Sequence, residues 1–89
     1  MITVVFDFQG MKKEKYEEII KTLMARGIAL DGRLYHIASE KPTGMLCVDV
    51  WESPEKVQKA AALLMPIFQE LGAPKTEPQI YPTVAAVAG

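Results

Sequence analysis

The sequence predicts an α+β domain with the element order β-α-β-β-α-β, the ferredoxin-like arrangement of two helices on one face of a four-stranded antiparallel sheet. Four segments rich in β-branched, aromatic or proline residues alternate with two longer segments whose apolar residues recur at helical spacing. The 89 residues are the length of one small domain. We therefore expect a single ferredoxin-like domain over residues 1–89.

The first strand and the first helix follow from composition and periodicity. The run ITVVFDF, residues 2–8, is typical of a strand and stops at Gln9-Gly10. From Lys12 to Arg26 apolar residues recur at helical spacing and charges fill the opposite face, which predicts a helix that ends at Gly27. The apolar positions are Tyr16, Ile19, Ile20, Leu23 and Met24.

The next two strands form a predicted hairpin. The segments GRLYHIASE, residues 32–40, and MLCVDVW, residues 45–51, flank the turn-forming tetrapeptide KPTG. A four-residue loop, residues 41–44, pairs Glu40 with Met45 and therefore places the single histidine, His36, opposite Asp49.

The second helix has clear start and stop signals. Ser53 can cap it, Pro54 suits its first position, and Gly72 can end it. Pro66 predicts a kink or break near Leu63 or Leu64. The residues expected to face inward are Val57, Ala60, Ala61, Leu64, Phe68 and Leu71.

The last predicted strand is TEPQIYPTVAAV, residues 76–87. It contains Pro78 and Pro82, which cannot donate hydrogen bonds to a ladder. We therefore expect it at an edge of the sheet.

Alternation divides the third strand into two faces. Leu46, Val48 and Val50 are uniformly aliphatic, and we expect them beneath the helices. The opposite face, expected to be open, carries Met45, Cys47, Asp49 and Trp51, joined by Leu34, His36 and Ala38 from the second strand. On the first strand the same reasoning assigns Val5 and Asp7 to the open face.

An apolar open face predicts an interface or a pocket. We expect a homodimer in which two such faces enclose a cavity, with Val5, Asp7, Cys47 and Trp51 as candidate ligand-binding residues for a small apolar or aromatic molecule. The alternative is a monomer in which Trp51 fills a core.

His36 and Asp49 are the candidate catalytic residues. A carboxylate beside an imidazole fixes its tautomer and leaves the second nitrogen free for a substrate proton. The alternative is that Asp49 only satisfies a buried His36. Tyr16 and Cys47 are predicted to serve in packing.

Composition argues against several other classes of function. Ten basic and eleven acidic residues give a net charge of −1 without a basic patch, which argues against nucleic-acid binding. One cysteine cannot form an internal disulfide, and no Cys/His spacing predicts a metal. We expect no cofactor. No signal-like or membrane-spanning run is present, so we expect a cytoplasmic location and no membrane partner.

Three segments resemble proteins of the antibiotic biosynthesis monooxygenase superfamily, small dimeric α/β barrels: GRLYHIAS, VDVWESPEKVQK and MPIFQELGAPKTEPQIYP. The resemblance is to an uncharacterised bacterial branch and covers the whole chain in length and element order. It implies a barrel completed by dimerisation, with the last strand reaching toward the partner.

The resemblance also separates subfamilies. Haem-degrading members use an asparagine on the first strand and a tryptophan and a histidine on the second helix. This chain has no asparagine, and its second helix has neither of the other two, which argues against haem degradation. The asparagine of the polyketide oxygenases is absent as well.

Three functions therefore stay open. The first is a barrel that binds a small apolar or aromatic ligand. The second is a cofactor-independent oxygenase or isomerase that uses His36 and Asp49. The third is a structural dimer without a ligand.

Overall fold

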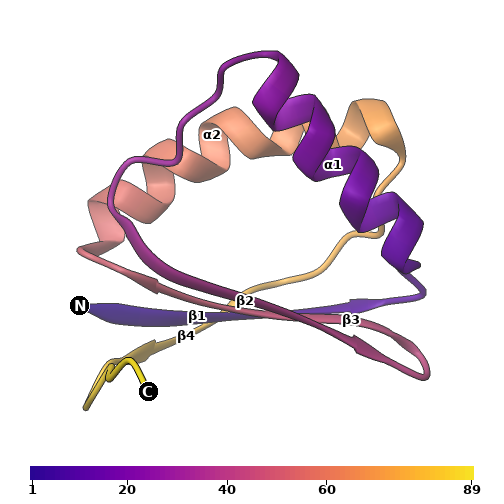
Figure 1. Ribbon diagram of the computed structural model, residues 1–89. Helices are drawn as coiled ribbons and strands as arrows, with labels where there is room; N and C mark the ends of the chain where they lie inside the picture. The colour runs from indigo at the N-terminus through magenta and orange to yellow at the C-terminus, as the bar shows by residue number, and fades with distance from the viewer.

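The computed structural model describes residues 1–89 and confirms the predicted element order (Figure 1). The elements are β1 (Ile2–Gln9), α1 (Lys13–Ala25), β2 (Arg33–Lys41), β3 (Gly44–Trp51), α2 (Pro54–Leu71) and β4 (Gln79–Pro82).

The four strands form one antiparallel sheet in the order β2-β3-β1-β4. Both helices cover the same face of this sheet, and the opposite face carries no other element (Figure 1). We call these the inner face and the outer face. The ferredoxin-like fold predicted from the sequence is therefore the observed fold.

Local signals in the sequence set the bounds of α2. The Ser53 side chain accepts a hydrogen bond from the backbone N–H of Lys56 at 3.3 Å, and Pro54 begins the helix. Gly72 ends it in the left-handed conformation, at φ 70°. The helix continues through Pro66, so the break considered at Leu63 or Leu64 does not occur. Neither helix combines the length and the apolar character that crossing a membrane requires.

The final strand is shorter than predicted. β4 ends at Pro82 and pairs only with β1, which places it at the sheet edge as expected. Beyond it the Thr83 hydroxyl lies 2.8 Å from that of Thr3, and residues 83–89 add no strand.

The hairpin has the predicted register with a tighter turn. Lys41 pairs with Gly44, which leaves Pro42 and Thr43 as the two turn residues, and His36 pairs with Asp49. Gly44 is required here, since a Cβ at this position would lie 2.1 Å from the Phe8 carbonyl oxygen and the φ angle is 154°.

The predicted assignment of the two sheet faces is wrong. Met45, Cys47, Asp49 and Trp51 are buried beneath the helices, with 3%, 4%, 5% and 2% of their surfaces exposed. Leu46, Val48 and Val50 lie on the outer face and are only partly buried.

The error extends to β1, because directly paired strand residues share a face. Val5 pairs with Val48 and Asp7 with Leu46, so both lie on the outer face. The inner residues of β1 are Val4, Phe6 and Phe8.

The core divides into two clusters on the inner face. The larger is formed by Phe8, Met11, Ile19, Leu23, Met45, Cys47 and Ile67, and the smaller by Val4, Trp51 and Ala60. Phe6 packs against both clusters. Met24 and Ala61, expected to face inward, are exposed instead, whereas Ile67 is buried.

Candidate functional site

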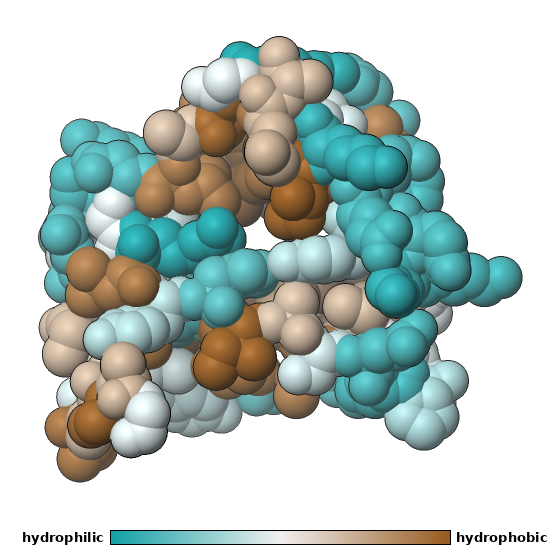
Figure 2. Space-filling model, in the orientation of Figure 1, coloured by the Kyte–Doolittle hydropathy of each residue, from teal (hydrophilic) through white to brown (hydrophobic).

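A cavity of about 60 Å³ lies between the sheet and the helices. Figure 2 shows a hollow between the helix layer and the sheet, with hydrophobic side chains above it. The lining is mainly apolar: Phe6, Phe8, Met11, Ile19, Leu23, Leu30, Cys47, Leu64 and Phe68, with Tyr16, Arg33, His36 and Asp49 as its polar or charged members. This cavity belongs to one protomer, whereas the sequence predicts a cavity enclosed between two open faces.

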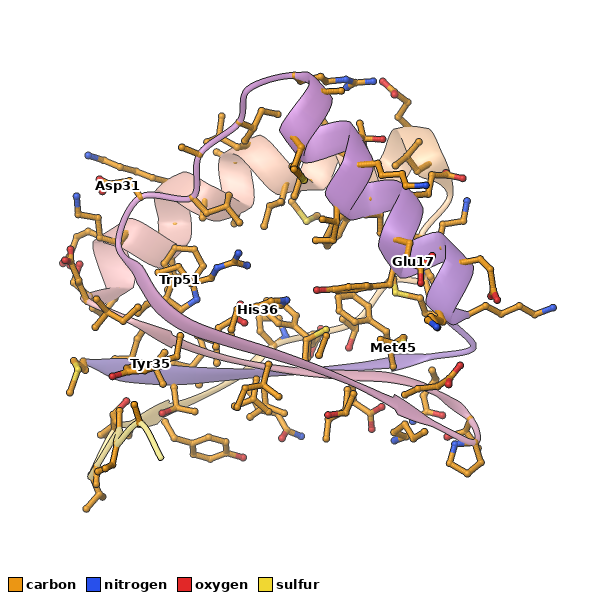
Figure 3. The ribbon with its side chains drawn as sticks, viewed as in Figure 1. Glu17, Asp31, Tyr35, His36, Met45 and Trp51 are labelled. Atoms are coloured by element: carbon orange, nitrogen blue, oxygen red, sulfur yellow. The ribbon has the colours of Figure 1, made fainter.

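His36 and Asp49 form the predicted pair at the floor of this cavity. The imidazole Nδ1 lies 2.5 Å from Asp49 Oδ1, with the N–H donating to the carboxylate. Asp49 is almost completely buried, and the His36 side chain is 23% exposed. His36 rises from the sheet into the space under the helices, and Trp51 lies on the same side (Figure 3).

Tyr16 is a third member of this cluster, and its role was not predicted. Its hydroxyl lies 2.6 Å from His36 Nε2, and the two rings are nearly parallel, with an interplanar angle of 10°. Because Nδ1–H donates to Asp49, Nε2 accepts the Tyr16 O–H. Tyr16, His36 and Asp49 therefore form a relay, a continuous chain of two hydrogen bonds from α1 through β2 to β3.

In the hydrogen bond between Tyr16 and His36, the proton stays on the Tyr16 oxygen. Burial raises the pKa of the Tyr16 phenol above its ordinary value, and the nearby Cys47 and Asp49 raise it further. Arg33 opposes this shift. The phenol is therefore neutral at physiological pH and can donate to His36.

Cys47 lines this cavity beneath the helices and not the predicted one between two open faces, and its chemistry is suppressed. Burial, with a contribution from Asp49, raises the pKa of the thiol to about 11. Since the thiolate is the nucleophile, Cys47 is an inert wall residue, consistent with its predicted packing role.

The other three predicted ligand-binding residues do not line the cavity. Val5 and Asp7 are on the outer face, where Lys41 binds the Asp7 carboxylate at 2.9 Å and lowers the Asp7 pKa. Trp51 is on the inner face but packs in the smaller core cluster, with its Nε1–H buried and without an acceptor.

Of the polar and charged lining residues, Tyr16 and Arg33 were missed as site residues. Tyr16 had a usable signal, since it was placed on the buried side of α1 and a buried phenol requires a hydrogen-bond partner. No signal in the sequence pointed to Arg33, because regular alternation places it on the other face from His36. No three His, Cys, Asp or Glu side chains in the chain are grouped so that they could hold a metal ion.

The cavity is small for a ligand. Pockets for drug-sized molecules measure about 300–1,000 Å³. A ligand of one or two rings therefore requires lining side chains such as Leu64 and Phe68 to change rotamer, or the helices to move away from the sheet.

Comparison with known proteins shows the fold. No protein-family model matches the chain, and no curated protein sequence matches it significantly. Among solved structures, SnoaB from Streptomyces nogalater, a cofactor-independent oxygenase, superposes with a TM-score of 0.72 at 15% identity, over 99% of this chain and 97% of that one. The chain therefore shares its fold with SnoaB.

Two further solved structures share this fold. A candidate antibiotic biosynthesis monooxygenase from Chloroflexus aurantiacus gives a TM-score of 0.63 at 16% identity, covering 98% of this chain and 96% of that one. A second candidate, from Deinococcus radiodurans, gives 0.59 at 13% identity, covering 98% and 95%. At these identities the likeness concerns the fold, so chemistry has to be argued from the cavity itself.

Proposed function

We propose that this chain binds a small, mainly apolar or aromatic molecule between its helices and its sheet, and that the Tyr16–His36–Asp49 relay moves a proton on or off it. The observation that carries the proposal is the unbroken relay at 2.6 and 2.5 Å beside an apolar cavity. The apolar lining supplies binding, and the relay supplies a general base whose tautomer is fixed.

The proton balance follows from the two hydrogen bonds. The Tyr16 oxygen takes a proton from an acidic C–H or O–H of the ligand while its own proton passes to His36 Nε2. His36 becomes an imidazolium, which the Asp49 carboxylate stabilises at Nδ1. The raised pKa of Tyr16 favours transfer of both protons together over a standing phenolate.

The resulting ligand carbanion or enolate has two outcomes. Return of the proton at another carbon is an isomerisation and needs no co-reactant. Reaction with dioxygen is an oxygenation, in which a CH₂ group and O₂ give C=O and H₂O. The likeness of the fold to a cofactor-independent oxygenase favours dioxygen as the second substrate.

A homodimer through the outer face is the second part of the proposal. The centre of this face is formed by Val5, Val48 and Val50, and its β2 edge by Tyr35 and Ile37, which are 43% and 59% exposed. A contiguous apolar face of this kind is typical of an interface. A second copy presents the same face and is self-complementary about a two-fold axis.

Proton abstraction can be tested without oxygen. In D₂O, we expect the wild type to accelerate deuterium exchange at C1 of 2-tetralone, a small aromatic ketone, over the buffer rate. His36→Ala and Tyr16→Phe should each reduce this acceleration by about 10²–10⁴-fold, the usual contribution of a general base.

The matched control is Tyr81→Phe, which removes an exposed hydroxyl. If wild-type protein leaves the exchange rate unchanged, or if all three variants behave alike, the relay only satisfies a buried histidine and the catalytic proposal is wrong. Oxygen uptake measured with the same ketone then separates oxygenation from isomerisation.

A further inference from the structure

A bulge at the start of β2 turns Arg33 toward the cavity. Arg33 pairs with Trp51 and Tyr35 pairs with Val50, so Leu34 is one extra residue in β2. In a regular strand Arg33 would share the outer face with Tyr35. The bulge places it on the inner face instead, and bulges commonly re-aim a side chain beside an active site.

The Arg33 guanidinium has no protein partner. It lines the cavity with His36 and Asp49 and is only partly exposed, yet it makes no side-chain hydrogen bond and lies in no ion pair. The Asp49 carboxylate is engaged by His36. The other arginine of the chain, Arg26, binds Glu70 at the surface.

The charge of Arg33 acts on the site residues. It lowers the pKa values of Tyr16 and Cys47, against the effects of burial and of Asp49. Its cross-strand neighbour Trp51 buries an Nε1–H that has no acceptor. The Arg33 guanidinium and the Trp51 indole N–H are therefore two neighbouring donors on the inner face that lack acceptors. Of the two residues, Arg33 lines the cavity.

We propose that Arg33 binds the carboxylate of the ligand, which makes the substrate class a small aromatic or conjugated carboxylic acid. This assignment rests on the proposed function. The guanidinium fork matches a carboxylate with two parallel hydrogen bonds, and an apolar surrounding strengthens them. Held by its carboxylate at Arg33, the ligand presents its ring to the apolar wall and to the hydroxyl of Tyr16.

Benzoate and its neutral isostere benzamide test this assignment by ¹H–¹⁵N NMR titration. Trp51 is the only tryptophan, so its single indole N–H resonance reports on the neighbourhood of Arg33. We expect benzoate to bind more tightly than benzamide and to shift this resonance. Arg33→Met should weaken benzoate binding by about ten- to a hundred-fold and leave benzamide unchanged.

Controls separate binding from folding. Arg26→Met removes the surface arginine and should not alter either titration, while Arg33→Lys keeps the charge, loses the fork and should bind benzoate with intermediate affinity. Thermal unfolding of each variant verifies that it is folded.

Two results would overturn the assignment in distinguishable ways. Equal binding of benzoate and benzamide, unaffected by Arg33→Met, leaves the pocket intact and shows that Arg33 only balances the charge of Asp49. If neither compound shifts any resonance of a cavity residue, the pocket itself, and with it the proposed function, is contradicted.

Discussion

The inner and outer faces of the sheet are both apolar, but they differ in the size and polarity of their side chains. The inner face carries Phe8, Met45 and Trp51 together with the buried His36–Asp49 pair. The centre of the outer face is built from smaller aliphatic residues such as Val5 and Val48, and its Asp7–Lys41 ion pair is partly exposed. Apolar character alone therefore does not identify the face that a helix layer covers.

The decisive difference is the need of the polar pair for a third partner. A buried imidazole has two nitrogens to satisfy, and Asp49 serves only one of them. The other is satisfied by Tyr16 of α1, which only the inner face can reach. A face that combines large side chains with a buried polar pair is thus the one that belongs under the helices.

The largest expected effect compares how much a side chain on the inner face and one on the outer face contribute to the free energy of unfolding. Phe8→Ala removes a large buried ring and should lower the free energy of unfolding by about 3–5 kcal/mol. Val48→Ala on the outer face should cost about 1 kcal/mol, because the side chain is only partly buried. Urea unfolding at one protein concentration measures both. Equal losses of unfolding free energy in the two variants would mean that the two faces are packed alike.

The second effect concerns pH and the thiol of Cys47. In the unfolded chain the thiol ionises near its ordinary pKa of 9.0, and in the folded chain near about 11. Between these values the unfolded state binds fewer protons, so the free energy of unfolding falls as pH rises, by up to about 3 kcal/mol.

The difference between wild type and Cys47→Ala isolates this slope from the titration of lysines and tyrosines. Below pH 9 the two proteins should show parallel pH dependence, and iodoacetamide should not alkylate the folded wild type at pH 8. Rapid alkylation there would contradict the burial of Cys47 beneath the helices.

The smallest effect tests the outer face as a dimer surface. Val48→Lys puts a charge at its centre and should weaken dimerisation by about ten- to a hundred-fold, or 1–3 kcal/mol, without unfolding the protomer. Analytical ultracentrifugation measures the change. Lys59→Met on exposed α2 is the control that alters charge elsewhere. A wild type that is monomeric at every concentration tested would refute the dimer.

Most of the fold could be predicted because its signals are local. The helical spacing in α1, the Ser53 cap and Gly72 stop of α2, and the turn between β2 and β3 each act over a few residues. The same locality gave the register that pairs His36 with Asp49, since a short turn fixes the partners of the whole hairpin. The last strand was predicted too long because no local signal marks where a proline-rich edge strand stops pairing.

Most of the cavity lining could not be predicted, because it depends on which face of the sheet the helices cover. A strand repeats every two residues, so the sequence separates its two faces without stating which one is covered. Phe6 and Phe8 were therefore missed, and Val5 and Asp7 were wrongly included. Arg33 could not be predicted at all, because a bulge interrupts that repeat and regular alternation would place it on the other face from His36.

The sequence by itself determined the order of the elements, their caps and the cross-strand pairing of His36 with Asp49, all of which depend on neighbours along the chain or across one turn. Only the tertiary structure decided which face is buried, that Tyr16 completes the relay and that Arg33 enters the cavity. These depend on how α1 and α2 lie over the sheet, and side-chain contacts between distant segments are formed only when the layers pack.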